Sequence, residues 1–208
     1  ALEAAQSAGA HAEQISDQTE VAHSLRLQGV VLTHAVDHES ARPYFERGLA
    51  LSRHIHDQSG VASMLNQLGT IEWVAGNLDA SEAYYRQSFE IRLKLEDEFG
   101  IAAALNNLAT VAGTRGDFTN VRQYCLESIE IKQRIGDRRG VAVSNYNIAT
   151  AAAYLGDTAE ARTYYERSLQ TRLEIRDNIG IGDCYYGLGE LARLSGSLED
   201  ARSLLWQS

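Results

Sequence analysis

The sequence predicts an all-α protein, a right-handed α-solenoid of stacked helix-turn-helix repeats. The main observation is internal repetition with a step of 40 residues, because self-similarity at such a period marks repeat architectures. The second is an apolar period of about 3.6 residues within each repeat, which is typical of amphipathic helices. The third is that only one proline occurs in 208 residues, since proline breaks helix interiors.

Glycine, aspartate and tyrosine positions all recur in the same register. The rows are Gly60, Gly100, Gly140 and Gly180; Gly76, Gly116, Gly156 and Gly196; Asp17, Asp57, Asp97, Asp137 and Asp177; and Tyr44, Tyr84, Tyr124 and Tyr164. These rows divide a single domain, 1–208, into a half repeat (1–17), four full repeats (20–59, 60–99, 100–139 and 140–179) and a partial repeat (180–208). We expect about eleven helices, and no linker interrupts the rows.

Each repeat contains the signals of two helices, as residues 60–99 illustrate. The first helix is predicted over about 60–75 from its apolar period, and Gly76 supplies the left-handed residue that ends it. Asn77 and its equivalents Asp117, Asp157 and Ser197 are good N-caps for the second helix, about 79–96. Asp97 is expected to close the next turn and cap the following helix.

Composition and charge limit the possible functions. The formal net charge is −9, which disfavours nucleic acid as a partner. The sequence contains no basic run and no apolar stretch of roughly 20 residues, so neither a membrane surface nor a membrane span is expected. No signal peptide is recognisable, so we expect a cytoplasmic protein whose two cysteines, Cys125 and Cys184, are buried or half-buried thiols. The chain lacks an initiator Met and stops inside an apolar pattern, so a fragment of a longer protein is expected.

Several rows resemble the tetratricopeptide repeat (TPR) family. Leu68-Gly69 and Leu188-Gly189 match its Leu-Gly pair. The small residues at the helix crossing are Ala41, Ser81, Ala161 and Ala201, and the aromatic positions are Phe45, Tyr85 and Tyr165, with Cys125 as a departure. The 40-residue unit is similar to the subclass found in kinesin light chains, in G-protein-regulating spindle adaptors and in the sensor domains of bacterial STAND-type ATPase regulators.

The resemblance implies a protein-protein interaction scaffold that holds a peptide or protein segment in a concave groove lined by the first helices. It implies no enzymatic activity, no catalytic residues and no cofactor. Carried over by register, the groove residues are His23, Arg26, His34, Asn66, Thr70, Trp73, Asn106, Thr110, Tyr146, Thr150, Tyr154, Tyr186, Glu190 and Arg193.

The residue types at these positions suit a peptide. Threonine and asparagine side chains can donate and accept hydrogen bonds, as an extended backbone requires. Tyrosine and tryptophan are the aromatic types favoured as interface anchors. A clamp for a C-terminal carboxylate is disfavoured, because the groove positions contain no lysine and Arg26 and Arg193 lie at opposite ends.

Other clusters have simpler interpretations. His34 and His38 have the spacing of a zinc pair, but the helix is expected to end near Val36, so they should not share one face, and no metal site is predicted. The charged residues of the second helices, including the row Arg92, Lys132 and Arg172, are expected on a solvated outer face.

Two alternatives to a peptide-binding scaffold stay open. One is the ligand-sensing or regulatory arm of a bacterial STAND-type ATPase or transcriptional regulator, whose ligand could be a small molecule. The other is an architectural spacer that self-associates through its exposed terminal helices.

Overall fold

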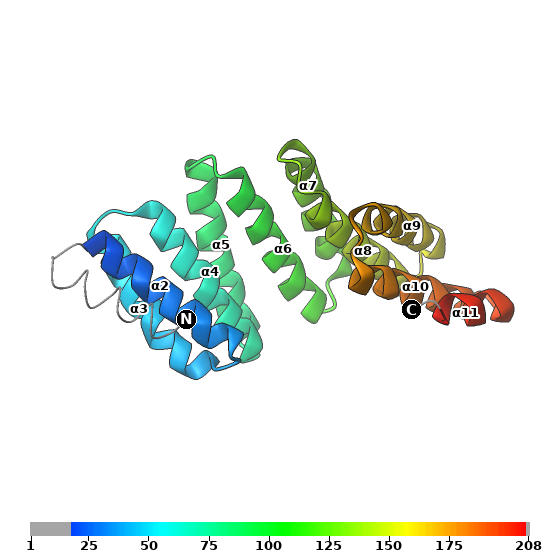
Figure 1. Ribbon diagram of the computed structural model, residues 1–208, viewed down its shortest axis with the longest axis horizontal. Helices are drawn as coiled ribbons and strands as arrows, with labels where there is room; N and C mark the ends of the chain where they lie inside the picture. The colour runs from blue at the N-terminus through cyan, green and yellow to red at the C-terminus, as the bar shows by residue number, and fades with distance from the viewer. Residues whose placement is uncertain (1–17, 207–208) are drawn as a thin grey trace. The chain divides into compact units, whose positions relative to one another are not determined.

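The computed structural model describes residues 18–206, which form ten helices (Figure 1). Most of them are 17 residues long, and between residues 18 and 206 there is no β-strand. The predicted half repeat over 1–17, with Asp17, lies outside the described residues. The all-α prediction is therefore confirmed for the described part of the chain.

The chain divides into two compact units, residues 1–100 and 101–208. The first contains α2 (Gln18–His34), α3 (His38–His54), α4 (Gln58–Val74) and α5 (Leu78–Lys94). The second contains nearly all of α6 (Glu98–Thr114), then α7 (Phe118–Arg134), α8 (Arg138–Tyr154), α9 (Thr158–Ile175), α10 (Asn178–Leu194) and α11 (Leu198–Leu205).

Within each unit, helices pack against their neighbours in sequence. Helices α2 to α5 form one such series and α7 to α11 another, and the first helices of successive repeats also touch, α2 with α4 and α8 with α10. A helical hairpin cannot bury its own apolar face, so stacking on the next hairpin completes the core. This arrangement confirms the predicted α-solenoid of stacked helix-turn-helix repeats.

The aspartate row caps the first helix of the following repeat, as predicted. Asp57, Asp137 and Asp177 are the N-caps of α4, α8 and α10, and each carboxylate accepts a hydrogen bond from the backbone N–H of the glycine three residues later. Asp97 does the same for Gly100, at 2.9 Å. Helix α4 consequently begins at Gln58, two residues before the expected start near residue 60.

The caps of the second helices are less uniform. The carboxylates of Asp117 and Asp157 accept from backbone N–H groups, but Asn77 and Ser197 make no such bond. The Asn77 amide instead donates to Glu72, at 2.7 Å. Glu72 follows Gly69 by three residues, where the TPR pattern has tyrosine, and it also pairs with Arg42, at 2.7 Å. The Asn77 hydrogen bond and then Arg42 lower the pKa of the buried Glu72 carboxyl.

The first helix of each full repeat ends in a left-handed residue. Gly76, Gly116, Gly156 and Gly196 have φ between 78° and 84°. In the first repeat the same position is Val36, with φ of 61° and 77% of its surface exposed. A β-branched residue is strained in this conformation, whereas glycine adopts it freely.

We expect Val36→Gly to stabilise the protein by about 1 kcal/mol, because it relieves left-handed strain and loses little buried surface. Urea unfolding of the two proteins measures the difference. The reverse change at the equivalent site, Gly76→Val, should destabilise by a similar amount. Equal stabilities in both comparisons would contradict this explanation of the row.

The aromatic and Leu-Gly rows of the repeat are in contact. A Cβ on Gly69 would lie 2.7 Å from the Tyr85 ring, and one on Gly29 would lie 2.6 Å from the Phe45 ring. At the departure Cys125 the residue opposite is Ala109, and both are buried in one cluster, whereas in the next repeat Ala149 packs in one cluster with the aromatic Tyr165.

Buried serines tie the two helices of a repeat together. The hydroxyls of Ser88, Ser128 and Ser168 each donate to a backbone carbonyl 26 residues earlier, in the preceding first helix, at 2.8 to 3.2 Å. A buried hydroxyl needs a partner, so these bonds fix how far one helix can slide along the other.

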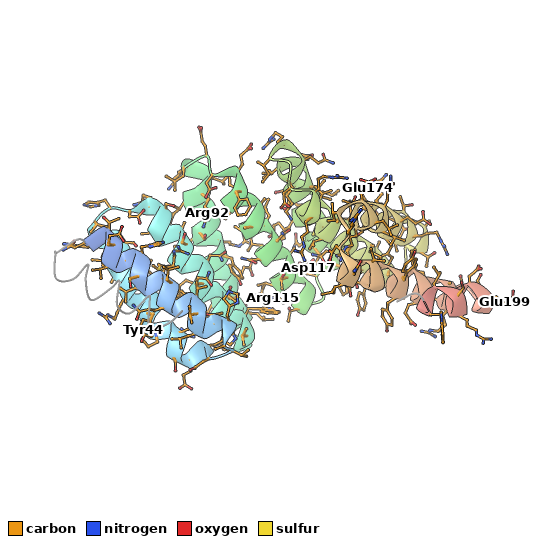
Figure 2. All side chains as sticks on the ribbon, viewed as in Figure 1. Tyr44, Arg92, Arg115, Asp117, Glu174 and Glu199 are labelled. Atoms are coloured by element: carbon orange, nitrogen blue, oxygen red, sulfur yellow. The ribbon has the colours of Figure 1, made fainter. Side chains whose placement is uncertain are left out.

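One prediction about charge is wrong. Lys132 is 2% and Arg172 5% exposed, and both lie between repeats, away from the solvated outer face. The Lys132 ammonium donates to the carbonyl of Gly140 and to Ser144. Arg92 pairs with Asp97 and reaches Ser63 at 3.4 Å; Figure 2 labels Arg92. Their long aliphatic stems allow these residues to pack inside while the charged ends find polar partners.

Candidate functional site

The second unit contains a cavity of about 380 Å³ between α6 and α8. It brings together three of the predicted groove residues, Thr110, Thr150 and Tyr154. Residues of α6 and α8 form two walls, and the start of α7 closes the site with Phe118 and Val121. The cavity is therefore formed by two first helices, α6 and α8, and by the start of the second helix α7.

An aromatic pair forms one side of this cavity. The rings of Phe118 and Tyr154 are stacked, with centroids 4.4 Å apart and planes 2° from parallel. Tyr154 is 71% exposed, so the outer face of the pair is open to solvent. Flat, rigid aromatic surface costs little conformational entropy on binding and favours apolar or planar groups.

The threonine hydroxyls are already engaged with their own helices. Thr110 donates to the carbonyl of Asn106, and Thr150 donates to that of Tyr146, both at 3.0 Å. The Thr150 hydroxyl also lies 3.1 Å from the hydroxyl of Tyr165. Such bonds to the residue four earlier are common for threonine in helices. A ligand would therefore find these oxygens mainly as acceptors.

Asn106 is tied into the interior. Its side-chain oxygen lies 3.3 Å from both Ser128 Oγ and Ser144 Oγ, and Ser144 also accepts from the buried Lys132. The asparagine thus belongs to a polar network around Lys132. Burial lowers the pKa of the Lys132 ammonium, and Asp137 opposes that shift.

The predicted residues of the first unit do not share one cavity. His23 and Arg26 border a second cavity of about 500 Å³ between α2 and α4. Thr70 is 3.1 Å from the Tyr85 hydroxyl and donates to the carbonyl of Asn66. Trp73 is partly exposed near the end of α4, and His34 is the exposed last residue of α2.

The remaining predicted residues line α8 and α10. Tyr146 packs edge-on against Tyr165, with centroids 5.4 Å apart, and the Arg172 guanidinium lies 5.6 Å from its ring centre. On α10, Tyr186 is exposed and Glu190 pairs with Arg193 at 2.9 Å. Burial raises the pKa of Tyr146.

Sequence reasoning missed Phe118 and Asn147 among the residues that line the α6–α8 cavity. Phe118 opens a second helix, whereas the prediction considered only first helices. A signal was present, because the equivalent positions are His38, Leu78, Thr158 and Leu198, and only Phe118 carries a large apolar ring. Asn147 forms a side-chain hydrogen bond with Cys125.

Between residues 18 and 206 no group of three or more His, Cys, Asp or Glu side chains is arranged to hold a metal ion. Cys125 and Cys184 are both buried, as predicted, and burial raises the pKa of the Cys125 thiol to about 11. No stretch of helix in the described residues combines the length and the hydropathy that crossing a bilayer requires.

Comparison with known proteins identifies the repeat. The sequence pattern of the family described as "Tetratricopeptide repeat" matches residues 60–134, 100–174 and 140–208. No curated protein matches the sequence.

Several solved structures share the fold. The crystal structure of BtubC (BKLC) from P. vanneervenii superposes with a TM-score of 0.86 at 18% identity, over 98% of this chain and 86% of that one. A Rap protein complexed with Competence and Sporulation Factor superposes with a TM-score of 0.74 at 14% identity, over 89% of this chain and 52% of that one. The STAND protein PH0952 from Pyrococcus horikoshii, which has a tetratricopeptide repeat sensor, superposes with a TM-score of 0.74 at 15% identity, over 91% of this chain and 33% of that one. At these identities the likeness concerns the fold.

Proposed function

The chain belongs to the tetratricopeptide repeat family, and we propose that it is a non-catalytic interaction module of the cytoplasm that binds a segment of a partner protein. The anchor of the segment would be an apolar or aromatic side chain held in the α6–α8 cavity against Tyr154. The single observation that carries this proposal is the open face of the stacked Phe118–Tyr154 pair beside a cavity of about 380 Å³.

The surroundings of the cavity support a peptide rather than a reactive substrate. Its walls combine small apolar residues, Ala109 and Ala151, with threonine hydroxyls that can accept hydrogen bonds from the N–H groups of a peptide backbone. An aromatic anchor with adaptable polar neighbours is a common composition of peptide-binding surfaces. The similar Rap structure was solved as a complex with Competence and Sporulation Factor, which is consistent with ligand binding by this fold.

We expect Tyr154→Ala to weaken binding by at least about 2 kcal/mol, roughly thirtyfold, because anchor residues carry most of the energy of such interfaces. Peptides selected from a random display library on the whole chain serve as probes, and calorimetry gives their dissociation constants. Tyr154→Phe keeps the ring and is the matched control, so it should bind normally. Equal affinity of the selected peptides for the wild type and Tyr154→Ala would refute the proposed anchor.

A ligand-sensing arm is the second candidate. The cavity volume falls within the range of roughly 300–1,000 Å³ that is usual for small-molecule sites, and a STAND protein with a tetratricopeptide sensor shares the fold. A fragment screen by NMR separates the two candidates. Fragments that shift the amide signals of Asn147 and Thr150, together with a display library that yields no binding peptide, would favour the sensor.

The remaining partner predictions have their own checks. A self-associating spacer requires a concentration-dependent mass in light scattering, and a monomer at high concentration would exclude it. The net charge of −9 disfavours nucleic-acid binding, and a mobility-shift assay at low salt tests that expectation.

A further inference from the structure

A row of cations lies between successive repeats, and the first repeat departs from it. Arg92, Lys132 and Arg172 stand 40 residues apart near the ends of α5, α7 and α9, and the same position at the end of α3 is Ser52. Each cation lies close to the aspartate five residues after it in the sequence. It also lies close to the first turn of the next repeat's first helix. The junction between α3 and α4 therefore has the aspartate, Asp57, without the cation.

A cavity of about 500 Å³ occupies this first junction. Ser52, Asp57 and Gly60 line it together with His23 of α2. Ser52 is 0% exposed, and among the described residues its hydroxyl has no hydrogen-bond partner. A buried hydroxyl without a partner costs about 1–3 kcal/mol, so this group favours a ligand that can bond to it.

The cavity matches, position by position, the place that a guanidinium fills at the next junction. Arg92 pairs with Asp97 and reaches Ser63. The residues 40 positions before Asp97 and Ser63 are Asp57 and His23, and both line the cavity. A Cβ on Gly100 would collide with Arg92, and a Cβ on Gly60 would lie 2.6 Å from Ser52 Oγ.

The carboxylate in the cavity is oriented for such a ligand. Asp57 Oδ1 accepts from the Gly60 backbone N–H at 2.9 Å, while Oδ2 lies beside Gly60, on the side that Arg92 occupies at the next junction. Within the described residues no cation pairs with Asp57: Arg26, which also lines the cavity, forms no ion pair with it. The site therefore offers a carboxylate and a hydroxyl to an incoming donor.

We propose that this cavity receives the guanidinium of an arginine side chain supplied by a partner protein. A guanidinium presents several N–H donors in a plane, which suits a carboxylate together with a hydroxyl. The net charge of −9 favours the approach of a basic segment. The site lies in the first unit and does not depend on the α6–α8 cavity.

The test uses the whole chain and N-acetyl-arginine amide, with N-acetyl-citrulline amide as the neutral analogue of the same shape. Titration followed by NMR should shift the amide signals of Asp57 and Gly60, with a dissociation constant on the order of millimolar, as one side chain allows. The citrulline compound should bind at least tenfold more weakly than the arginine compound. Equal binding of the two compounds, or no binding of the arginine compound, would overturn the proposal.

Two variants locate the site. Ser52→Arg supplies the cation from the chain itself, and it should abolish binding while raising Tm. Arg92→Ser opens the next junction, and it should add a second set of shifts, at Gly100. Binding that persists unchanged in Ser52→Arg would place the ligand elsewhere. Tyr154→Ala should leave arginine binding unaltered, so failure of the peptide anchor and failure of this site are distinguishable.

Discussion

Replacing Ile148 by aspartate is expected to unfold the helices around it. Ile148 is 0% exposed and packs in one cluster with Ala109, Cys125 and Ala151. A carboxylate placed there has no cation within the cluster, and burying it costs several kcal/mol even if it takes up a proton. A domain is stabilised by only about 5–15 kcal/mol, so circular dichroism should show a large loss of helix.

Cys125 reports on the same cluster and provides the internal check. Its thiol is buried and its pKa is raised to about 11, so the folded wild type should react very slowly with a thiol reagent near neutral pH. Ile148→Asp should expose it and speed the reaction. Ile148→Val, which removes one methylene at a cost of about 0.5–1.5 kcal/mol, should leave Cys125 protected. Protection in the aspartate variant would show that the cluster tolerates the charge.

Removing the guanidinium of Arg172 should cost about 3–5 kcal/mol, because it leaves the partly buried Asp177 carboxylate with only the exposed Arg139, 3.9 Å away, as a cationic partner. Arg172 lies 3.5 Å from Asp177 and 3.7 Å from Asp183, and its Nε donates to Ser168 at 3.2 Å. Urea unfolding of Arg172→Ala measures this cost.

The chain itself supplies two controls for that change. Arg172→Lys reproduces the residue of the preceding repeat, Lys132, and should retain most of the stability. Arg138→Ala breaks an exposed pair with Glu174, labelled in Figure 2, and should cost about 0–1 kcal/mol. If the alanine variants at 172 and 138 were equally stable, the buried pairs would have no special role.

The helices and their caps could be predicted because local signals and the repeat agree. Asp57, Asp137 and Asp177 each precede a helix in the same register, and each accepts from the glycine three residues later. Capping depends on a few neighbouring residues, so the sequence contains all the information that it requires. Gly76 and its row likewise end helices because of their own backbone freedom.

Contacts between helices could not be predicted in the same way. The sequence shows that Gly60 recurs every 40 residues, but it does not show why glycine is required there. A Cβ at Gly60 would collide with the capping aspartate, and in the later repeats it would also collide with Arg92, Lys132 or Arg172. A long cationic side chain in a sequence gives no indication of whether its stem lies outside or between helices. The burial of Lys132 and Arg172 therefore needed the structure.

Three of the residues that line the candidate cavity could be named from the sequence. Register placed Thr110, Thr150 and Tyr154 on one face, and all three line the same cavity. Phe118 was missed, since its ring reaches the cavity from the start of a second helix. The internal bonds of the threonines follow from a local preference of that residue, but only the structure shows that Thr150 also meets Tyr165.

The contacts of the cation row also mean that the repeats are not interchangeable modules. Lys132 donates to Ser144, and Arg172 pairs with Asp183, in each case on the helix that follows. If segments 100–139 and 140–179 exchanged places, the register would set Lys132 opposite Cys184 and Arg172 opposite Ala103. Duplication or recombination of these segments would therefore need compensating changes at the new boundaries before the shuffled chain folded as well as its parent.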